Sequence, residues 1–335
     1  MDWSRGPTVG RGSSAAVSAA FSKFSGEVFA VKSTEFSSSD SLQQEQSILS
    51  VLTHPRIVTY IGHNTTMENH KLLYNLLIEF LPGGTLIDEI RRQNVSLKEP
   101  LMGYYTRHIL EGLDHIHSIG IAHCDIKGQN ILVGEKGAKI ADFGCAKWVH
   151  SPDKIKTIAG TPMFMSPETA RGEEQSFPAD IWALGCTIIE IATGKSPWSG
   201  ISDDPACILY RIAFSDESPT IPDFLSGKAK DFLFKCLSRD PKERWTSKEL
   251  LKHPFVNQES NFHEERNKEI NFCSPTSIID LNLWNSVEEV SEVPSPCSKS
   301  ETCSPVGRNR IRQLTSYSGE PNWTDEENWM TVRVG

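Results

Sequence analysis

His123-Cys124-Asp125-Ile126-Lys127-Gly128-Gln129-Asn130 is the stretch that decides how this chain of 335 residues is interpreted. Asp142-Phe143-Gly144 follows it, and Gly160-Thr161-Pro162 then runs into Ser166-Pro167-Glu168. Asn130 comes five positions after Asp125, and Asp142 comes twelve positions after Asn130. Any one of these triplets occurs in unrelated proteins, but the whole set in this order and at these spacings is hard to attribute to chance.

These segments resemble the C-terminal half of a protein kinase active site. The resemblance implies that Asp125 orients the proton of an attacking hydroxyl and that Lys127 neutralises the phosphoryl group in transfer. It also implies that Asn130 and Asp142 hold Mg²⁺, which prefers hard oxygen ligands. Thr161 resembles the threonine that bonds to the catalytic Asp and Lys. The chain is therefore expected to use ATP and Mg²⁺ and to act on serine or threonine, since tyrosine kinases lack a lysine where Lys127 stands.

A glycine-containing stretch near the N-terminus, Gly10-Arg11-Gly12-Ser13-Ser14-Ala15-Ala16-Val17, ends fifteen positions before Lys32. Bare backbone at Gly10 and Gly12 lets amide N–H groups approach nucleotide phosphates. Ala15 stands where the family has a third glycine, and a methyl group is tolerated there if φ is negative. The resemblance implies that this loop binds ATP through Val9, Gly10, Arg11, Gly12, Ser13, Ser14, Ala15, Ala16 and Val17.

Lys32, in Ala30-Val31-Lys32, resembles the strand lysine that holds the α- and β-phosphates, and Ala30 is expected beside the nucleotide. Glu45 is its expected ion-pair partner. Apolar residues around Glu45 recur at three- and four-residue steps from Leu42 to Leu52, which predicts an amphipathic helix that ends before Pro55. Rotation of this helix is the expected on/off lever, because it makes or breaks the Lys32–Glu45 pair.

Ile78-Glu79-Phe80-Leu81 precedes the break Pro82-Gly83-Gly84 and resembles the hinge between two kinase lobes. Ile78 would then be the gatekeeper, and the backbone of Glu79 and Leu81 would face the adenine.

Cys124 stands where the family usually has the arginine of His-Arg-Asp. That guanidinium normally clamps a phosphorylated residue of the activation loop bidentately, and a thiol cannot do so. We therefore expect activity to depend less on loop phosphorylation than in most kinases. Replacement of Thr157 by alanine should leave much of the basal rate, and abolished activity would contradict this hypothesis.

The expected fold class is α+β. It is a bilobal protein kinase fold with a small, mainly β N-lobe with one helix (about 3–81) and a larger, mainly α C-lobe (about 82–255). Two further matches are architectural: Glu168 should pair with Arg244, and Asp180 should brace the catalytic loop. Asp180 opens a segment that is apolar nearly all round, a pattern typical of a helix at the centre of a domain.

The net charge of −9 and the pI near 5.6 disfavour a nucleic-acid-binding surface, which requires clustered Lys and Arg. The eight cysteines include no Cys-x-x-Cys pair, a pattern that suits reduced thiols rather than disulfides or zinc ligands. No export signal, lipidation motif or apolar run of membrane-spanning length is recognised. We expect a soluble protein of the cytoplasm, the nucleus or both, with no membrane or nucleic-acid partner.

Residues 256–335 form a regulatory tail that is expected to be mostly disordered, because Ser, Pro, Asn and Glu dominate it. Ile278–Trp284 and Trp323–Trp329 are two apolar islands within it, which could be docking segments or could pack back onto the catalytic domain. Ser274, Ser295 and Ser304 each precede a proline. They are candidate feedback sites for a proline-directed kinase, although such dipeptides are common in disordered tails.

Three local stretches are similar to the MEKK-like MAP kinase kinase kinases, especially short plant members: residues 160–168, Ala192–Trp198 and Leu250–Phe255. By that resemblance the substrate is a MAP kinase kinase, phosphorylated on activation-loop Ser/Thr. Two alternatives stay open. One is a pseudokinase-like scaffold that binds cascade partners without phosphotransfer, and the other is a Ser/Thr kinase outside the MAP kinase cascade.

Overall fold

The computed structural model describes residues 2–12, 15–92, 96–150, 158–199 and 204–257, which all belong to one compact unit, Met1–Trp284. Ser13, Ser14 and Thr157 lie outside the described residues. The same holds for the tail from residue 258 onward, including both apolar islands and the three Ser-Pro sites.

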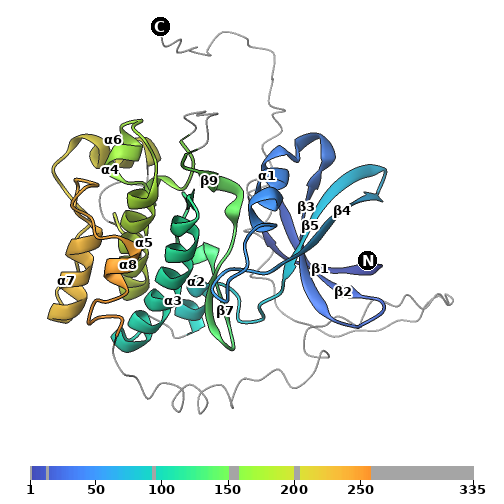
Figure 1. Ribbon diagram of the computed structural model, residues 1–335, viewed down its shortest axis with the longest axis horizontal. Coiled ribbons are helices and arrows are strands. Elements are labelled where there is room, and N and C mark those ends of the chain that lie inside the picture. The colour runs from blue at the N-terminus through green and yellow to red at the C-terminus, as the bar shows by residue number, and fades with distance from the viewer. Residues whose placement is uncertain (1, 13–14, 93–95, 151–157, 200–203, 258–335) are drawn as a thin grey trace, which may run out of the picture. The chain divides into compact units, whose positions relative to one another are not determined.

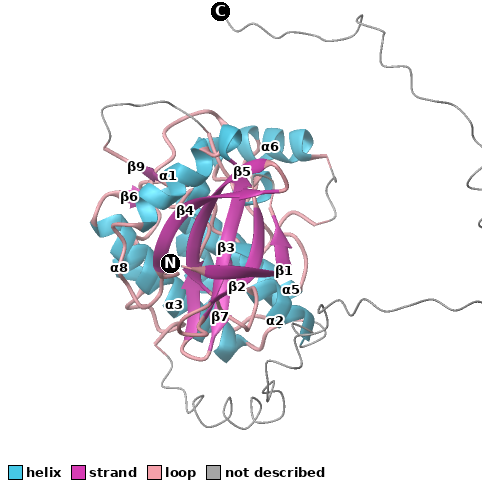
Figure 2. Ribbon diagram, turned by 90° about the vertical axis from the view of Figure 1, so that its right-hand side faces the viewer, coloured by secondary structure: helices cyan, strands magenta, loops and turns pink. Residues whose placement is uncertain are grey.

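The N-terminal part is a five-stranded antiparallel sheet in the order β1-β2-β3-β5-β4, which Figure 2 views with α1 beside it. The strands are β1 (Trp3–Arg11), β2 (Ala16–Ser22), β3 (Val28–Glu35), β4 (Tyr60–Glu68) and β5 (Lys71–Glu79). A 3-10 turn, η1 (Phe36–Ser38), leads into α1 (Asp40–Leu49). The predicted helix is present, but Leu52 lies beyond its end and is nevertheless buried.

The register of this sheet brings separate sequence segments together. Lys32 on β3 lies opposite Val17 on β2 and Leu76 on β5, and Ala30 lies opposite Ile78. Because side chains alternate between the two faces of a strand, Ala30 and Lys32 share one face. That face therefore carries Lys32 together with Ile78, which lies at the hinge end of β5.

The C-terminal part is mainly helical and lies on the other side of the hinge (Figure 1). Its helices are α2 (Leu86–Arg92), α3 (Glu99–Ser118), α4 (Pro167–Ala170), α5 (Phe177–Thr193), α6 (Pro205–Phe214), α7 (Gly227–Cys236) and α8 (Ser247–Leu250). Short antiparallel pairs join β7 (Ile131–Gly134) to β8 (Gly137–Ile140) and β6 (Ile121–Ala122) to β9 (Lys147–Trp148). Three 3-10 turns complete it: η2 (Gly128–Asn130), η3 (Phe143–Cys145) and η4 (Pro162–Phe164).

Helix α5 is the centre of this lobe. Nearly every residue from Ala179 to Ala192 is buried, as the all-round apolar sequence predicts. Gly194 ends the helix in the left-handed conformation (φ 66°), where glycine has no Cβ to clash. Because α5 is packed against other elements on nearly all sides, its polar side chains can hold neighbouring loops in fixed positions.

One apolar core runs through both lobes. It extends from Ala30 and Leu42 through α3 and α5 to Phe255, while a smaller cluster of Ala20, Phe29, Val31 and Leu77 occupies the other face of the sheet. The predicted bilobal α+β fold is thus confirmed for the described residues.

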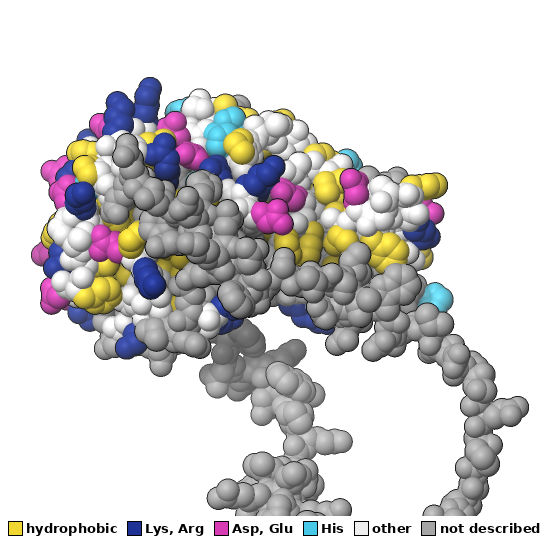
Figure 3. Space-filling view, turned by 90° about the horizontal axis from the view of Figure 1, so that it is seen from below, with side chains coloured by type: hydrophobic (Ala, Val, Ile, Leu, Met, Phe, Trp, Pro, Cys, Tyr) yellow, Lys and Arg dark blue, Asp and Glu magenta, His cyan; other side chains and the backbone are white. Residues whose placement is uncertain are grey.

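The expected Glu168–Arg244 pair is present and buried, with both Nη–Oε distances 2.6 Å. Within the described ranges, no disulfide joins the cysteines, and no helix is both long and apolar enough to cross a membrane. Figure 3 shows one face of the molecule, where basic and acidic side chains are interspersed over the described residues.

Candidate active site

Asp180, near the start of α5, holds the catalytic loop (residues 123–130) in place. Its carboxylate accepts hydrogen bonds from the backbone N–H groups of His123 and Cys124, each at 2.8 Å, and contacts His117 Nε2 at 2.9 Å. Burial would raise the pKa of Asp180, but these partners hold it below its ordinary value. Cys124 has a positive φ of 65°, which is unusual outside glycine. The bonds to Asp180 hold the backbone in that conformation.

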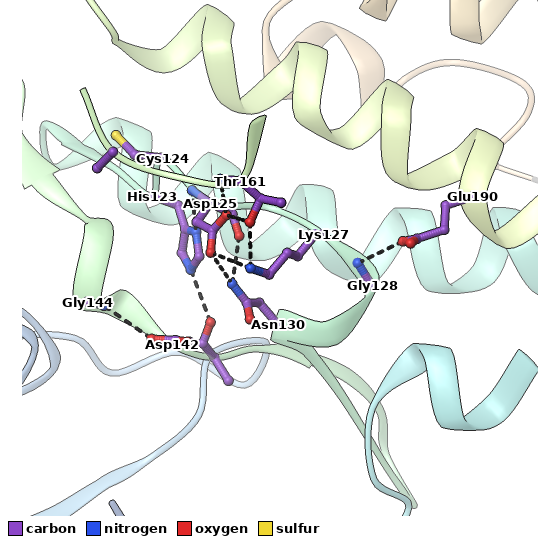
Figure 4. Close-up of polar contacts among 12 residues, drawn as sticks. His123, Cys124, Asp125, Lys127, Gly128, Asn130, Asp142, Gly144, Thr161 and Glu190 are labelled. Carbon is purple, nitrogen blue, oxygen red and sulfur yellow. Dashed lines mark hydrogen bonds and ion pairs between the residues drawn. The ribbon is translucent and has the colours of Figure 1, made fainter. Parts of the chain in front are cut away.

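Asp125 is the hub of the polar network in Figure 4. Its Oδ1 accepts from the backbone N–H and the hydroxyl of Thr161, at 2.9 and 2.8 Å. Its Oδ2 accepts from Lys127 Nζ at 2.8 Å, and Lys127 also donates to Thr161 Oγ1 at 2.6 Å. Asp125, Lys127 and Thr161, all predicted catalytic residues, therefore bind one another in a triangle. The Asp125 carboxylate and the Lys127 ammonium group form an ion pair within it.

Asn130 is oriented by the same carboxylate. Its Nδ2 donates to the backbone oxygen of Asp125 at 2.8 Å and to Asp125 Oδ2 at 2.9 Å. An amide that uses its nitrogen in this way turns its oxygen to the opposite side. In the described part of the chain Asn130 Oδ1 has no hydrogen-bond donor, so a hard oxygen ligand faces the cleft that Asp142 also lines.

Lys32, Glu45 and Asp142 form the second charged group. Lys32 Nζ lies 2.6 Å from Glu45 Oε2 and 2.7 Å from Asp142 Oδ1. The other oxygen of Glu45 accepts from the Phe143 backbone N–H at 3.2 Å. Helix α1 is thus connected through one carboxylate to β3 and to the Asp-Phe-Gly turn, and the expected ion pair is formed.

The protonation of this group follows from burial and pairing. Burial would lower the pKa of Lys32, but Glu45 and Asp142 raise it above its ordinary value, so the ammonium stays charged. Burial raises the pKa of Glu45, an effect that Lys32 partly offsets. Burial would also raise the pKa of Asp142, yet Lys32 holds it below its usual value. Asp142 is therefore an anion, with 47% of its side chain exposed to solvent.

A cleft of about 1010 Å³ lies between the lobes. Most of the predicted nucleotide-binding residues line it, namely Val9, Gly10, Arg11, Gly12, Ala15, Val17, Ala30, Lys32, Ile78, Glu79, Leu81, Asn130 and Asp142. Ala16 does not line it, because side chains alternate along β2 and Ala16 is next to Val17. Asp125, Lys127, Glu45 and Thr161 complete its polar wall.

The cleft suits a magnesium nucleotide. A Cβ on Gly10 would meet no atom within 4 Å and one on Gly12 would meet only Ala15 O at 3.6 Å, so the fold itself does not require glycine there. Their missing side chains keep the roof of the cleft open instead.

The hinge offers backbone groups to a base. Glu79 N–H donates to Thr59 O at 2.9 Å, and Leu81 O accepts from Gly84 N at 3.2 Å. Leu81 N–H has no acceptor within the described residues although Leu81 is buried, so it is a donor available to a ligand. The Glu79 side chain is turned away and binds Lys139 and Thr59.

The family model of the protein kinase domain matches residues 3–256. The chain belongs to the protein kinase family. The kinase is 47% identical over 347 residues to mitogen-activated protein kinase kinase kinase 18 of Arabidopsis thaliana, across 99% of both chains. It is 48% identical over 293 residues to kinase kinase kinase 17 of the same plant, across 86% of this chain and 78% of that protein. These comparisons confirm the resemblance to plant MAP kinase kinase kinases. Family membership implies the use of ATP and a divalent metal ion.

Glu190 and Gln175 are among the polar residues of this region that sequence reasoning did not single out. Glu190, near the end of α5, lines the cleft and its Oε2 accepts from the Gly128 backbone N–H at 3.3 Å. Burial raises the pKa of Glu190 to about 7. An acidic residue inside an apolar helix is a signal that could have identified it. Gln175, which contacts the activation segment (residues 142–168), has no such signal.

Proposed function

We propose that this kinase transfers the γ-phosphoryl group of ATP to serine or threonine hydroxyls in the activation loop of a MAP kinase kinase. The observation that carries the proposal is the Asp125–Lys127–Thr161 triangle beside a cleft with two oxygen ligands. The match to a MAP kinase kinase kinase across 99% of both chains supports the substrate class.

Each residue has a distinct proposed role. Asn130 Oδ1 and the Asp142 carboxylate would hold the divalent ion, and Lys32 would bind the α- and β-phosphates. When bound, Mg-ATP supplies the phosphoryl group and the positive charge of the metal. Asp125 accepts the hydrogen bond of the acceptor hydroxyl and takes its proton, while Lys127 neutralises charge that develops beside it.

The polar contacts that the proposal uses are already formed among the described residues. Glu45 already contacts both Lys32 and the Phe143 backbone, and Phe143 is fully buried and packs edge-on against His123 at 4.8 Å between ring centroids. Positioning and electrostatic stabilisation account for most of the catalysis in phosphoryl transfer, so a preformed polar network is the main requirement.

Incubation of the purified full chain with labelled ATP, Mg²⁺ and a panel of MAP kinase kinases tests the proposal. We expect label on activation-loop Ser/Thr of at least one of them, and none with Asp125→Asn. Binding of Mg-ATP without transfer to any acceptor would replace the proposal by the scaffold alternative. Transfer to general acceptors but to no MAP kinase kinase would place the kinase outside the cascade.

The Ser-Pro sites at Ser274, Ser295 and Ser304 are proposed feedback sites for the downstream kinase. Each phosphate would add about −1.5 to −2 charges to a tail that is already acidic. Phosphopeptide mapping after incubation with an active MAP kinase tests this, and absence of modification at all three sites would remove the idea.

A further inference from the structure

Gln175 is a buried amide in the loop between α4 and α5, with only 6% of its surface exposed. The preceding residues, Glu173 and Glu174, are exposed. Burial of a carboxamide is unfavourable unless its donor and acceptor groups find partners. Its partners therefore show which segments the side chain connects.

The first partner is the backbone of Ala159, in the C-terminal part of the activation segment. Gln175 Nε2 donates to Ala159 O at 2.9 Å, and Gln175 Oε1 accepts from Ala159 N at 3.4 Å. Both polar backbone groups of one residue are thus engaged by one side chain, as in a pair of antiparallel strands. The position of Ala159 is defined by two contacts rather than by one.

Two further segments meet at the same carboxamide. Its Nε2 lies 3.4 Å from the backbone oxygen of Cys124 in the catalytic loop, and its Oε1 lies 3.4 Å from Lys147 Nζ on β9. One side chain therefore connects the catalytic loop to both ends of the activation segment.

Ala159 is only two residues before Thr161, and the intervening chain has little freedom. Gly160 has a φ of 113°, and a Cβ built there would lie 2.3 Å from Cys124 O. Thr161 then bonds to Asp125 through both its backbone N–H and its hydroxyl. Because residues 159–161 lie directly against the catalytic loop, a displacement of Ala159 would move Thr161 away from Asp125.

We propose that Gln175 is a positioning residue for phosphotransfer, whose carboxamide holds residues 159–161 on the catalytic loop and keeps Thr161 on Asp125. Because Cys124 offers no guanidinium to a phosphorylated residue of the activation loop, the Gln175 contacts provide an anchor that does not depend on phosphorylation. This inference deepens the proposed kinase activity and rests on it.

The kinetic test compares full-length wild type with Gln175→Ala, Gln175→Glu and Glu174→Gln. Gln175→Glu keeps the size of the side chain but cannot donate to the Ala159 and Cys124 oxygens. We expect both Gln175 variants to lower kcat by about 10- to 100-fold, because small misplacement of catalytic groups has effects of this size. The dissociation constant of Mg-ATP should stay unchanged, since no contact of Gln175 reaches the nucleotide cleft. Glu174→Gln changes a neighbouring exposed residue and should behave as wild type.

Hydrogen–deuterium exchange of residues 158–165 provides a second readout that needs no activity. We expect faster exchange there in Gln175→Ala than in wild type, with the same thermal unfolding temperature. An inactive wild type would refute the proposed function, while the exchange measurement would still decide whether Gln175 anchors the segment. Unchanged kcat in both Gln175 variants of an active kinase, or unchanged exchange in Gln175→Ala, would overturn the inference.

Discussion

Two buried cation–carboxylate pairs have similar chemistry and different surroundings. Lys32–Glu45 lies at the cleft, where Lys32 keeps 14% of its side chain exposed and is shared with the half-exposed Asp142. Arg244–Glu168 lies inside the C-terminal lobe, with 0% and 4% of the side chains exposed. Lys32 has two carboxylate partners at the cleft, whereas Arg244 has one inside the lobe, so we infer that the first pair serves activity and the second stability.

The partners of Arg244 support this distinction. Two of its N–H groups bind Glu168, and further bonds reach the backbone oxygens of Ser238, Pro178 and Arg239, at 2.7, 2.9 and 3.2 Å. All five N–H donors of the guanidinium are used. Within the described ranges Lys32, by contrast, donates to two carboxylates, one on α1 and the other directly before η3.

Replacement of Lys32 by methionine is expected to have the largest effect on activity. The rate of phosphotransfer should fall by about a thousandfold, because a charge directed at the phosphates is removed. Stability should change little, since Glu45, whose pKa burial already raises, can take up a proton. Initial-rate assays and thermal unfolding measure the two quantities. Lys71→Met, at an exposed lysine of the same sheet, is the matched control and should leave both unchanged.

Replacement of Arg244 by methionine is expected to have the largest effect on stability. It leaves Glu168 buried without a cation, and loss of one partner of such a pair costs about 3–5 kcal/mol. Urea denaturation measures this loss. The double variant Glu168→Gln/Arg244→Met should be less destabilised than the sum of the single variants. If Arg244→Met lost less free energy of unfolding than Lys32→Met, the assignment of stability to the Arg244–Glu168 pair would be contradicted.

Exchange of the two cations sharpens the comparison further. Arg244→Lys keeps the charge but can form at most three of the five bonds, so the free energy of unfolding should fall by about 2 kcal/mol. Lys32→Arg should leave the unfolding free energy close to that of wild type and lower the phosphotransfer rate, because a planar guanidinium does not fit a site built around one ammonium nitrogen. Initial-rate assays and urea denaturation measure the two effects. Equal losses of unfolding free energy in Arg244→Lys and Lys32→Arg would show that both pairs are structural.

Glu190 is a half-buried carboxylate that has no cation as a direct partner in the part of the chain that the structure describes, and its predicted effect is the smallest. Its folded pKa of about 7 lies above the ordinary value of 4.5, so the folded protein binds the proton more tightly than the unfolded chain. Its contribution to stability is therefore present below pH 4.5 and is lost as the pH rises to 7. Glu190→Gln should be more stable than wild type at pH 8, by about 1 kcal/mol, because one pKa unit corresponds to about 1.4 kcal/mol and solvent at this half-buried group weakens the effect. At pH 4.5 the two should be similar, and a difference of the same size at both pH values would contradict this assignment. Thermal unfolding at the two pH values measures it.

Much of the site could be predicted from the sequence because phosphoryl transfer requires particular side chains at particular spacings. The order of Lys32, Glu45, Asp125, Asn130 and Asp142 resembles that of a protein kinase, which implied two lobes, and the apolar patterns indicated α1 and α5. Ala16 was expected with its neighbours at the nucleotide but lies outside the cleft, because alternation along β2 could be applied only once the strand was placed.

Identity and order of the reactive groups were determined by the sequence alone, since they depend on which atoms a side chain carries. The tertiary structure decided where the remaining polar groups go, since that depends on which distant segments fold against them. Asn130 turns its oxygen to the cleft because Asp125 takes its nitrogen, and Gln175 meets Ala159 and Cys124 from another loop. No local sequence pattern encodes these contacts, because the hydrogen-bond partner of a buried polar atom depends on which distant segment the fold places beside it.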